Sequence, residues 1–239
     1  MRIATWNLER GGRRGAAFDR QRAVLDSISA DITVLTEPPW QLSTTCKGLV
    51  AAPRERQAHG EPEAWVAIQG DGVEPVSPAA RYGRLAVAAR TTALREPVVV
   101  YGSVLPWLAA PRQAAELLAT PSETYAEMFK RVLREQVADV RALQLRFPGE
   151  LLVWAGDFNQ TLAGANWGGS NRSRALLECS IETLGLDAWN QRERHALDGL
   201  CAIDLICGPN DRTPIAVTRI EPAADGPKLS DHAGYVVEV

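Results

Sequence analysis

The segment Leu151-Leu152-Val153-Trp154-Ala155-Gly156-Asp157-Phe158-Asn159 contains the most informative pattern in this chain. It opens with a continuous apolar run, which predicts a β-strand covered on both faces. It closes, after a glycine, with an acid and an amide. Functional residues of α/β proteins collect at strand ends, so the segment predicts a central strand that leads into a functional site.

The same pattern recurs along the chain. Asn7 follows one apolar run, Glu37 follows a second, and Asp231-His232 precedes the last. Each of these polar residues alone is most often a turn former or a helix cap, so the argument depends on their number and order. Strands are predicted over residues 3–8, 32–37, 64–69, 85–89, 98–105, 151–157, 203–207, 215–220 and 234–239.

Three helices are predicted between these strands. Thr120 and Glu123 form a capping box ahead of the long second helix, with Pro121 at its first position. Ser170 is the expected cap of the third helix, and Gly185 is suited to end it. The interspersed strands and helices indicate an α/β protein with a single domain over residues 1–239. The helices are expected over residues 16–30, 121–147 and 171–184.

Composition indicates an ordinary globular protein. The chain has 239 residues, of which 46% are hydrophobic and 23% charged, and no apolar run is long enough to span a bilayer. The first residues lack the pattern of a signal peptide, so we expect a cytoplasmic protein without membrane or obligate protein partners. The four cysteines form no Cys-x-x-Cys pair, which disfavours a zinc site or a disulfide framework. The net charge of −3 disfavours binding nucleic acid by bulk attraction, although a local arginine cluster could still bind it.

Asp204 is the acid that is hardest to explain as an ordinary surface residue. It lies between Ile203 and Leu205 in a predicted strand, where a buried carboxylate needs a partner or a metal. His232 needs an acceptor for its ring N–H, and a carboxylate is the usual one at catalytic sites. The sequence therefore predicts an Asp204–His232 dyad that holds the imidazole in one tautomer for phosphate contact or proton transfer.

Taken together, five motifs resemble those of the endonuclease/exonuclease/phosphatase superfamily, the DNase I-like proteins. Their order and their spread over the whole chain make the resemblance specific. It implies a four-layer α/β/β/α sandwich, in which two mixed β-sheets pack face to face with helices outside. The motifs are Thr5-Trp6-Asn7-Leu8, Leu35-Thr36-Glu37, Gly156-Asp157-Phe158-Asn159, Ile203-Asp204-Leu205-Ile206 and Ser230-Asp231-His232.

The resemblance implies metal-dependent hydrolysis of a phosphoester. Mg²⁺ or Mn²⁺ is the expected cofactor, because the candidate ligands Glu37, Asn7 and Asp231 are hard oxygen donors. Asp157 is expected to orient or deprotonate the attacking water. Asn159 is expected to donate a hydrogen bond to a phosphoryl oxygen as its negative charge grows. Family members are described with one or two metals, and the sequence leaves that number open.

The sequence departs from the family at one point. The family often has a second histidine, or a tyrosine, at the end of the central strand, and the run 99–107 contains no histidine. Tyr101 and Ser103 are candidates to replace it. His59 and His195 have the sequence surroundings of exposed loop residues, which leaves the acid catalysis open.

Arginines and tryptophans near these motifs are candidates for substrate binding. Arginine clusters suit phosphate oxygens, although a solvated surface explains them equally well. A tryptophan in a loop after a catalytic strand can stack on a base, and packing against the core is the slightly favoured alternative. The candidates are Arg10, Arg13, Arg14, Arg172, Arg174 and Trp167, with Trp107 as a second tryptophan.

Three functional hypotheses remain from the sequence. The leading one is a metal-dependent phosphodiesterase, a nuclease with nucleic acid as its substrate. The second is a phosphatase or phospholipid-headgroup hydrolase on the same scaffold. The third is a non-catalytic binding protein, which the intact set of acids, amides and histidine argues against.

Overall fold

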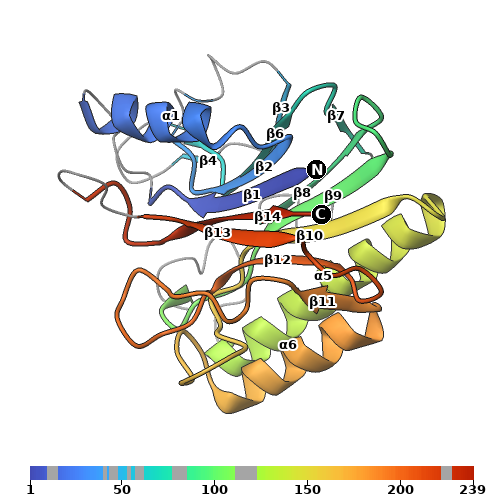
Figure 1. Cartoon of the computed structure of the whole chain (residues 1–239). Helices are drawn as coiled ribbons and strands as arrows, with labels where there is room; N and C mark the ends of the chain where they lie inside the picture. Colours follow the sequence, from blue (N-terminus) through green and yellow to red (C-terminus); the bar gives the residue numbers. More distant parts are fainter. Residues whose placement is uncertain are drawn as a thin grey trace.

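The computed structural model describes residues 1–9, 16–39, 42, 48–52, 55–56, 62–76, 85–110, 123–221 and 228–239. Two six-stranded β-sheets pack face to face, with α1 outside one sheet and α5 and α6 outside the other (Figure 1). This is the four-layer α/β/β/α sandwich that the resemblance implied. The described helices are α1 (Ala16–Ile28), α5 (Tyr125–Arg146) and α6 (Asn171–Thr183).

Each sheet has a parallel pair of strands near its centre and antiparallel strands outside it. In the first sheet the parallel pair is β1 with β2, and in the second it is β9 with β10. The first sheet has the order β13 (Ala216–Ile220), β14 (Gly234–Glu238), β1 (Arg2–Asn7), β2 (Ile32–Thr36), β6 (Val66–Gly70), β3 (Leu49–Ala51). The second has the order β11 (Leu186–Ala188), β12 (Asp204–Pro209), β10 (Leu151–Asp157), β9 (Val98–Val104), β8 (Ala86–Thr91), β7 (Glu74–Pro75). A separate two-stranded ladder joins β4 (Glu55–Arg56) and β5 (Pro62–Glu63).

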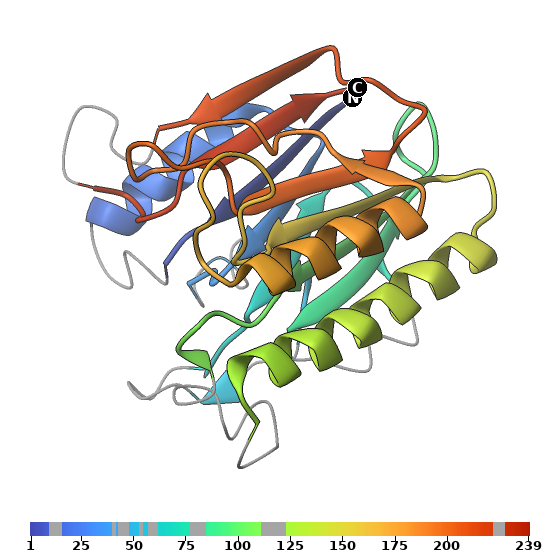
Figure 2. The same cartoon turned by 90° about the horizontal axis from the view of Figure 1, so that it is seen from below.

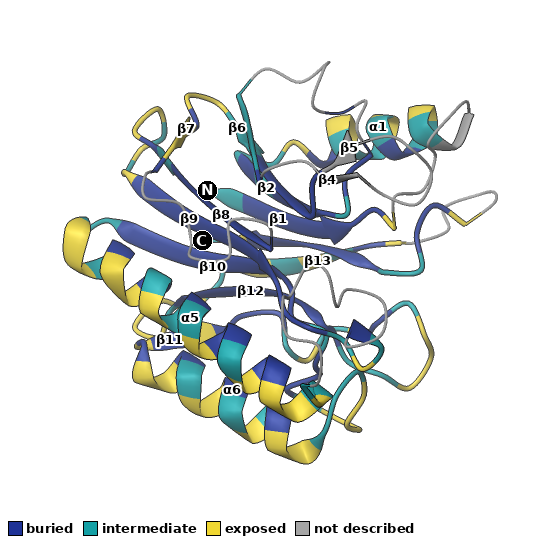
Figure 3. Cartoon of the chain, turned by 180° about the vertical axis from the view of Figure 1, so that it is seen from behind, coloured by how far each residue is buried: buried dark blue, intermediate teal, exposed yellow. Residues whose placement is uncertain are grey.

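The main core extends through the space between the sheets and under α5 and α6, because buried residues of both helices belong to the same cluster. Strands β9 and β10 are buried at every position, as their continuous apolar runs predicted, and Figure 3 shows the strands as the buried centre of the molecule. Trp154 of β10 packs its ring edge-on against Tyr101 of β9, with 6.3 Å between the ring centroids. Such aromatic pairs add to the apolar burial that stabilises the sandwich.

The helices bury one face each against the outer faces of the sheets. Phe18, Val24 and Leu25 of α1 pack on Trp6 and Leu8 beside the first sheet. Helices α5 and α6 lie side by side across the second sheet, as Figure 2 shows. Their outward faces are exposed, which is the amphipathic pattern expected of surface helices.

The predicted start of the long helix was wrong. Helix α5 begins at Tyr125, and its capping box consists of Thr124 and Glu127 rather than Thr120 and Glu123. The sequence contains the same Thr-x-x-Glu spacing twice in succession, so the pattern alone did not distinguish the two. Glu123 instead forms an ion pair with Arg131 at 2.6 Å. Thr120 and Pro121 lie outside the described residues.

Several short strands had no recognisable sequence pattern. Strands β3, β7 and β11 contain two or three residues each and lie at or near sheet edges. Their extended backbone follows from pairing with a longer neighbour rather than from their own alternation. No helix in the described part of the chain has the length and apolar character needed to cross a bilayer.

Candidate active site

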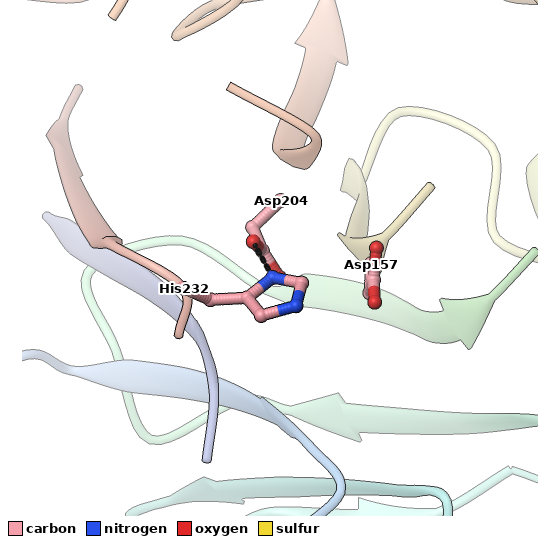
Figure 4. A group of neighbouring side chains, drawn as sticks. All are labelled: Asp157, Asp204 and His232. Atoms are coloured by element: carbon pink, nitrogen blue, oxygen red, sulfur yellow. Dashed lines mark hydrogen bonds and ion pairs between the residues drawn. The ribbon is translucent and has the colours of Figure 1, made fainter. Parts of the chain in front are cut away.

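The topology brings the polar strand ends to one edge of the sandwich. Strands β1, β2 and β10 end there, so Asn7, Glu37 and Asp157 meet at that edge. Antiparallel strands that pair with them begin where they end, and β12 therefore begins at the same edge with Asp204 directly opposite Asp157. His232 precedes β14, the antiparallel partner of β1. Figure 4 shows Asp157, Asp204 and His232 as neighbours.

The predicted Asp204–His232 dyad is present. Oδ2 of Asp204 lies 2.6 Å from Nδ1 of His232, and Asp204 is fully buried. Burial lowers the pKa of His232, but the charge of Asp204 and this hydrogen bond outweigh it, so the pKa of His232 is raised. Asn190 holds the backbone on which Asp204 lies. Its side chain donates to the Asp204 carbonyl at 2.8 Å and accepts from the Ile206 N–H at 2.8 Å. The sequence analysis missed Asn190, which follows no recognisable motif.

Asp157 is a buried carboxylate that accepts two hydrogen bonds. Its Oδ2 accepts from Nδ2 of Asn7 at 3.0 Å, and its Oδ1 accepts from the backbone N–H of Asn159 at 2.9 Å. Burial, followed by the negative charge of Asp204, raises the pKa of Asp157 to about 7. A carboxylate whose pKa lies near neutrality is suited to accept a proton from water.

Asn159 and Glu37 both adopt the left-handed backbone conformation, with φ of 50° and 48°. This conformation is uncommon for residues with a side chain, and it is often found at functional positions. The Asn159 side chain donates one hydrogen bond to the Leu105 carbonyl at 3.0 Å. Both residues line the same cleft as Asp157, and the charge of Glu37 adds to the rise in the pKa of Asp157.

The Ser230-Asp231-His232 motif is tied to the end of β1. Ser230 donates to the Asn7 carbonyl at 2.6 Å and accepts from the His232 N–H at 3.1 Å. The Asp231 N–H donates to Oε2 of Glu9 at 2.9 Å, and Oδ1 of Asp231 lies 3.7 Å from Nε2 of His232. Glu9 was not identified from the sequence, because a charged residue two positions after Asn7 has the pattern of ordinary surface.

The prediction that His195 is an exposed loop residue was wrong. Only 3% of it is exposed, and its ring packs edge-on against His232 with 5.7 Å between centroids. Its Nδ1 accepts from the Leu197 N–H at 3.0 Å, and burial lowers its pKa. The polar neighbours of His195 in the sequence suggested solvent, but Arg219 holds the loop against the sheet by donating to the His195 carbonyl at 3.2 Å. His59 lies outside the described residues.

Tyr101 and Ser103, the two candidates for the absent second histidine, are both bonded inside the second sheet and its helix layer. The Tyr101 hydroxyl donates to Asp139 of α5 at 2.9 Å. The Ser103 hydroxyl accepts from the Trp154 indole at 2.8 Å. The histidine that lies beside His232 is therefore His195, which belongs to a loop and not to the central strand.

The donor set fits a divalent cation. One ligand atom from each of Asp157, Asp204 and His232 lies within 4.8 Å of the others. In the described part of the chain, Oδ1 of Asp204 and Oδ1 of Asp231 are buried without a hydrogen-bond partner. Among the described residues, these two carboxylate oxygens have no hydrogen-bond donor and can accept a cation. Hard cations prefer this kind of oxygen-rich site.

The arginines predicted to bind substrate differ in their exposure and in their hydrogen bonds. Arg172 is exposed in the first turn of α6. Arg174 donates to the Gly164 carbonyl at 3.0 Å, to the Leu162 carbonyl, and to Glu178 at 3.1 Å, so it braces the loop that precedes α6. Arg10, Arg13 and Arg14 lie outside the described residues.

A cleft of about 630 Å³ opens over the carboxylates. This volume is within the range of about 300–1,000 Å³ found for small-ligand sites. No lysine or arginine contributes to its lining among the described residues. The lining comprises Glu37, Trp65, Trp107, Leu108, Ala109, Asp157, Asn159, Asn166, Trp167, Gly168, Gly169 and His232.

Comparisons with solved structures find the same fold. The 3′-5′ exonuclease (NExo) from Neisseria meningitidis is similar with a TM-score of 0.67 at 18% identity, covering 100% of this chain and 99% of that one. The endonuclease domain of TRAS1, a telomere-specific non-LTR retrotransposon, gives 0.61 at 18% identity, covering 99% and 96%. A humanized D. rerio TDP2 gives 0.58 at 13% identity, covering 99% and 97%.

At these identities the structural likeness establishes the fold alone, and a search of curated protein sequences finds no match. The family assignment rests on a sequence model. The model described as the Endonuclease/Exonuclease/phosphatase family matches residues 4–232, and that span contains all five motifs that meet at the site. The chain therefore belongs to the endonuclease/exonuclease/phosphatase family.

Proposed function

We propose that this protein is a Mg²⁺-dependent phosphodiesterase that acts on nucleic acid. The observation that carries the proposal is the buried cluster of Asp157, Asp204 and His232 beside an open cleft. Buried charges of this kind are costly to maintain unless they serve a reaction or a metal. Among the similar structures, one is named an exonuclease and another an endonuclease domain, which supports the nuclease assignment.

We assign the cation to the oxygen donors Glu37, Asn7 and Asp231 beside the Asp157–Asp204–His232 cluster. His232 itself is bonded to Asp204 and serves as a proton donor, so it is not assigned as a ligand. A divalent cation bound there would neutralise charge on the phosphoryl oxygens and on the leaving oxygen. Mn²⁺ should substitute for Mg²⁺, because the ligands are oxygen donors.

Protein side chains then transfer the protons and stabilise the negative charge that develops. Asp157 accepts the proton of the water whose oxygen attacks phosphorus, while the bond from phosphorus to the leaving oxygen breaks. His232, kept charged by Asp204, donates from Nε2 to a phosphoryl oxygen or to the leaving oxygen. Asn159 has a second amide N–H beside the one that it gives to Leu105, and we assign that N–H to the growing negative charge.

The test is a screen of purified protein with Mg²⁺ or Mn²⁺. The substrates are single-stranded DNA, duplex DNA, RNA, a phospholipid, a generic diester and a generic monoester. We expect cleavage of nucleic acid that excess chelator abolishes and added cation restores. Full hydrolysis in chelator would contradict the metal mechanism. Cleavage of the monoester alone, or of a phospholipid headgroup alone, would replace the nuclease with the phosphatase or headgroup-hydrolase alternative.

A further inference from the structure

Trp167 is an exposed indole in a molecule that buries its other described tryptophans more deeply. It is 37% exposed, whereas Trp6 and Trp154 are fully buried and Trp65 is 7% exposed. From its sequence surroundings, core packing is the slightly favoured expectation for Trp167. Its exposure at the lining of the active-site cleft favours a role in binding instead.

The loop that carries Trp167 is fixed by hydrogen bonds. The Trp167 N–H donates to the Thr161 hydroxyl at 3.0 Å, and the Trp167 carbonyl accepts from the Thr161 N–H at 3.2 Å. At Gly168, where φ is +83°, a Cβ atom would lie 2.4 Å from the Asn159 carbonyl oxygen. The backbone that carries the indole is therefore fixed next to Asn159 before any ligand binds, which lowers the entropy cost of binding.

The ring of His195 lies between the ring of Trp167 and the ring of His232. The His195 ring lies 5.1 Å from the Trp167 ring and 5.7 Å from the His232 ring, measured between centroids. The cleft has two further indoles in its lining, Trp65 and Trp107, whose centroids lie 5.4 Å apart. Leu108, 58% exposed, adds apolar surface to the same lining. A ligand at the site thus meets flat aromatic surface close to the dyad.

We propose that this surface binds an unpaired nucleobase of the nucleotide next to the scissile phosphate, with the base stacked on Trp167. The inference deepens the proposed nuclease function and rests on it. It assigns the substrate class as single-stranded, frayed or extrahelical nucleic acid rather than intact duplex.

Two physical reasons support an unpaired base. In a duplex both faces of a base are covered by its neighbours, so a paired base reaches an indole only after unstacking, which costs free energy. A stacking surface is sequence-tolerant, because every base has a π-face. The described lining of the cleft has no lysine or arginine, so stacking is the main attraction that this part of the cleft offers beyond the metal centre.

The experiment compares oligonucleotides that differ by one base. In a single strand with one preferred cleavage site, each nucleotide around that site is replaced in turn by an abasic spacer. We expect one spacer position next to the scissile phosphate to weaken binding by about five- to 150-fold, the range measured for base–aromatic stacking. A matched blunt duplex should be cleaved more slowly than the single strand.

Variants assign the effect to Trp167. Trp167→Ala should weaken binding of the unmodified strand by a similar factor and shrink the penalty of the spacer at that position, whereas Trp167→Phe should retain most of both. Leu145→Ala is the matched control, because Leu145 is 78% exposed on α5 and lies outside the cleft lining. Thermal unfolding of each variant verifies that it is folded.

The outcomes separate this inference from the proposed function. Cleavage of nucleic acid with no spacer penalty, or with duplex preferred over single strand, would overturn the stacking inference and leave the nuclease in place. A spacer penalty that Trp167→Ala leaves unchanged would also overturn it. Absence of nucleic-acid cleavage together with hydrolysis of a generic diester would instead overturn the proposed substrate and the inference that depends on it.

Discussion

At the scale of single residues, the site is a balance of buried charges. Asp157 and Asp204 are paired across neighbouring strands, and both are at least 98% buried. His232 is hydrogen-bonded to Asp204, and this bond together with the charge of Asp204 raises the pKa of His232. The two acids thereby acquire different roles. Among the described residues, Asp204 is bonded to the imidazole, whereas Asp157 accepts hydrogen bonds from an amide and a backbone donor and has a pKa of about 7.

The dyad should act as a unit. We expect His232→Ala and Asp204→Asn each to lower kcat by about 10²–10⁴-fold, the usual contribution of a positioned acid or base. The double variant should be little worse than either single variant. Asp198→Asn is the matched control, since the Asp198 side chain is 97% exposed. Losses that multiply in steady-state kinetics would show that the two residues act separately.

The pKa of Asp157 sets a pH dependence. Because Asp157 must be deprotonated to accept a proton from water, kcat/KM should fall as pH drops through about 7. A bound cation stabilises the carboxylate, so saturating Mg²⁺ should move this limb to lower pH. A pH–rate profile at low and saturating Mg²⁺ measures both effects. A rate constant that is flat between pH 5 and 8 at low Mg²⁺ would exclude Asp157 as the base.

At the scale of the elements, glycine allows the central parallel strands to approach each other just before Asp157. Gly156 has φ of +139°, and a Cβ atom there would lie 2.0 Å from the Ser103 carbonyl oxygen of β9. Any side chain would have to displace the backbone of a buried strand. The residue therefore links the packing of β9 and β10 to the position of the Asp157 carboxylate.

Gly156→Ala should lower the free energy of unfolding by about 2–4 kcal/mol, because strain and a buried collision combine. Gly199→Ala separates these causes. Gly199 also has positive φ, at +78°, but no atom lies within 4 Å of the position that a Cβ would take there, so only the cost of the backbone conformation remains. Urea unfolding of the two variants gives the difference. Equal losses would show that the approach to β9 contributes nothing.

At the scale of the whole molecule, charge and shape act on the substrate differently. The net charge of −3 opposes long-range attraction of a polyanion. Local attraction must then come from individual arginines, and in the described part of the chain Arg172 is exposed while Arg174 is occupied by the loop. The arginines of the segment after β1 remain the predicted contacts to the phosphate backbone.

Salt dependence tests those contacts. Binding of single-stranded DNA to an Asp157→Asn variant should weaken as salt rises, with a slope that reports the phosphates neutralised. Replacing Arg13 and Arg14 together with Ala should flatten that slope by roughly one to two units. Arg134→Ala, on an exposed face of α5, is the control. Binding that is flat with salt in the parent variant would favour a small phosphoester as the substrate.

Sequence patterns alone predicted the long buried strands, the five family motifs and the polar residues within those motifs. Long buried strands such as β10 have a continuous apolar run because both faces are covered, and that run is visible without coordinates. Asp204 was recognisable as buried because apolar residues surround it in the strand. Local patterns of this kind depend on neighbours in the chain, so they also predicted the Ser170 cap of α6 correctly.

Features that depend on residues far apart in the chain could be seen in the folded structure but not in the sequence. His195 is buried because a loop folds over the sheet, and its polar neighbours in the sequence carry no sign of that. Trp167 lies in the lining of the cleft rather than in the core, with its ring 5.1 Å from the ring of His195, which belongs to a different loop. Such contacts close long loops between elements, and their free energy arises from packing rather than from local propensity.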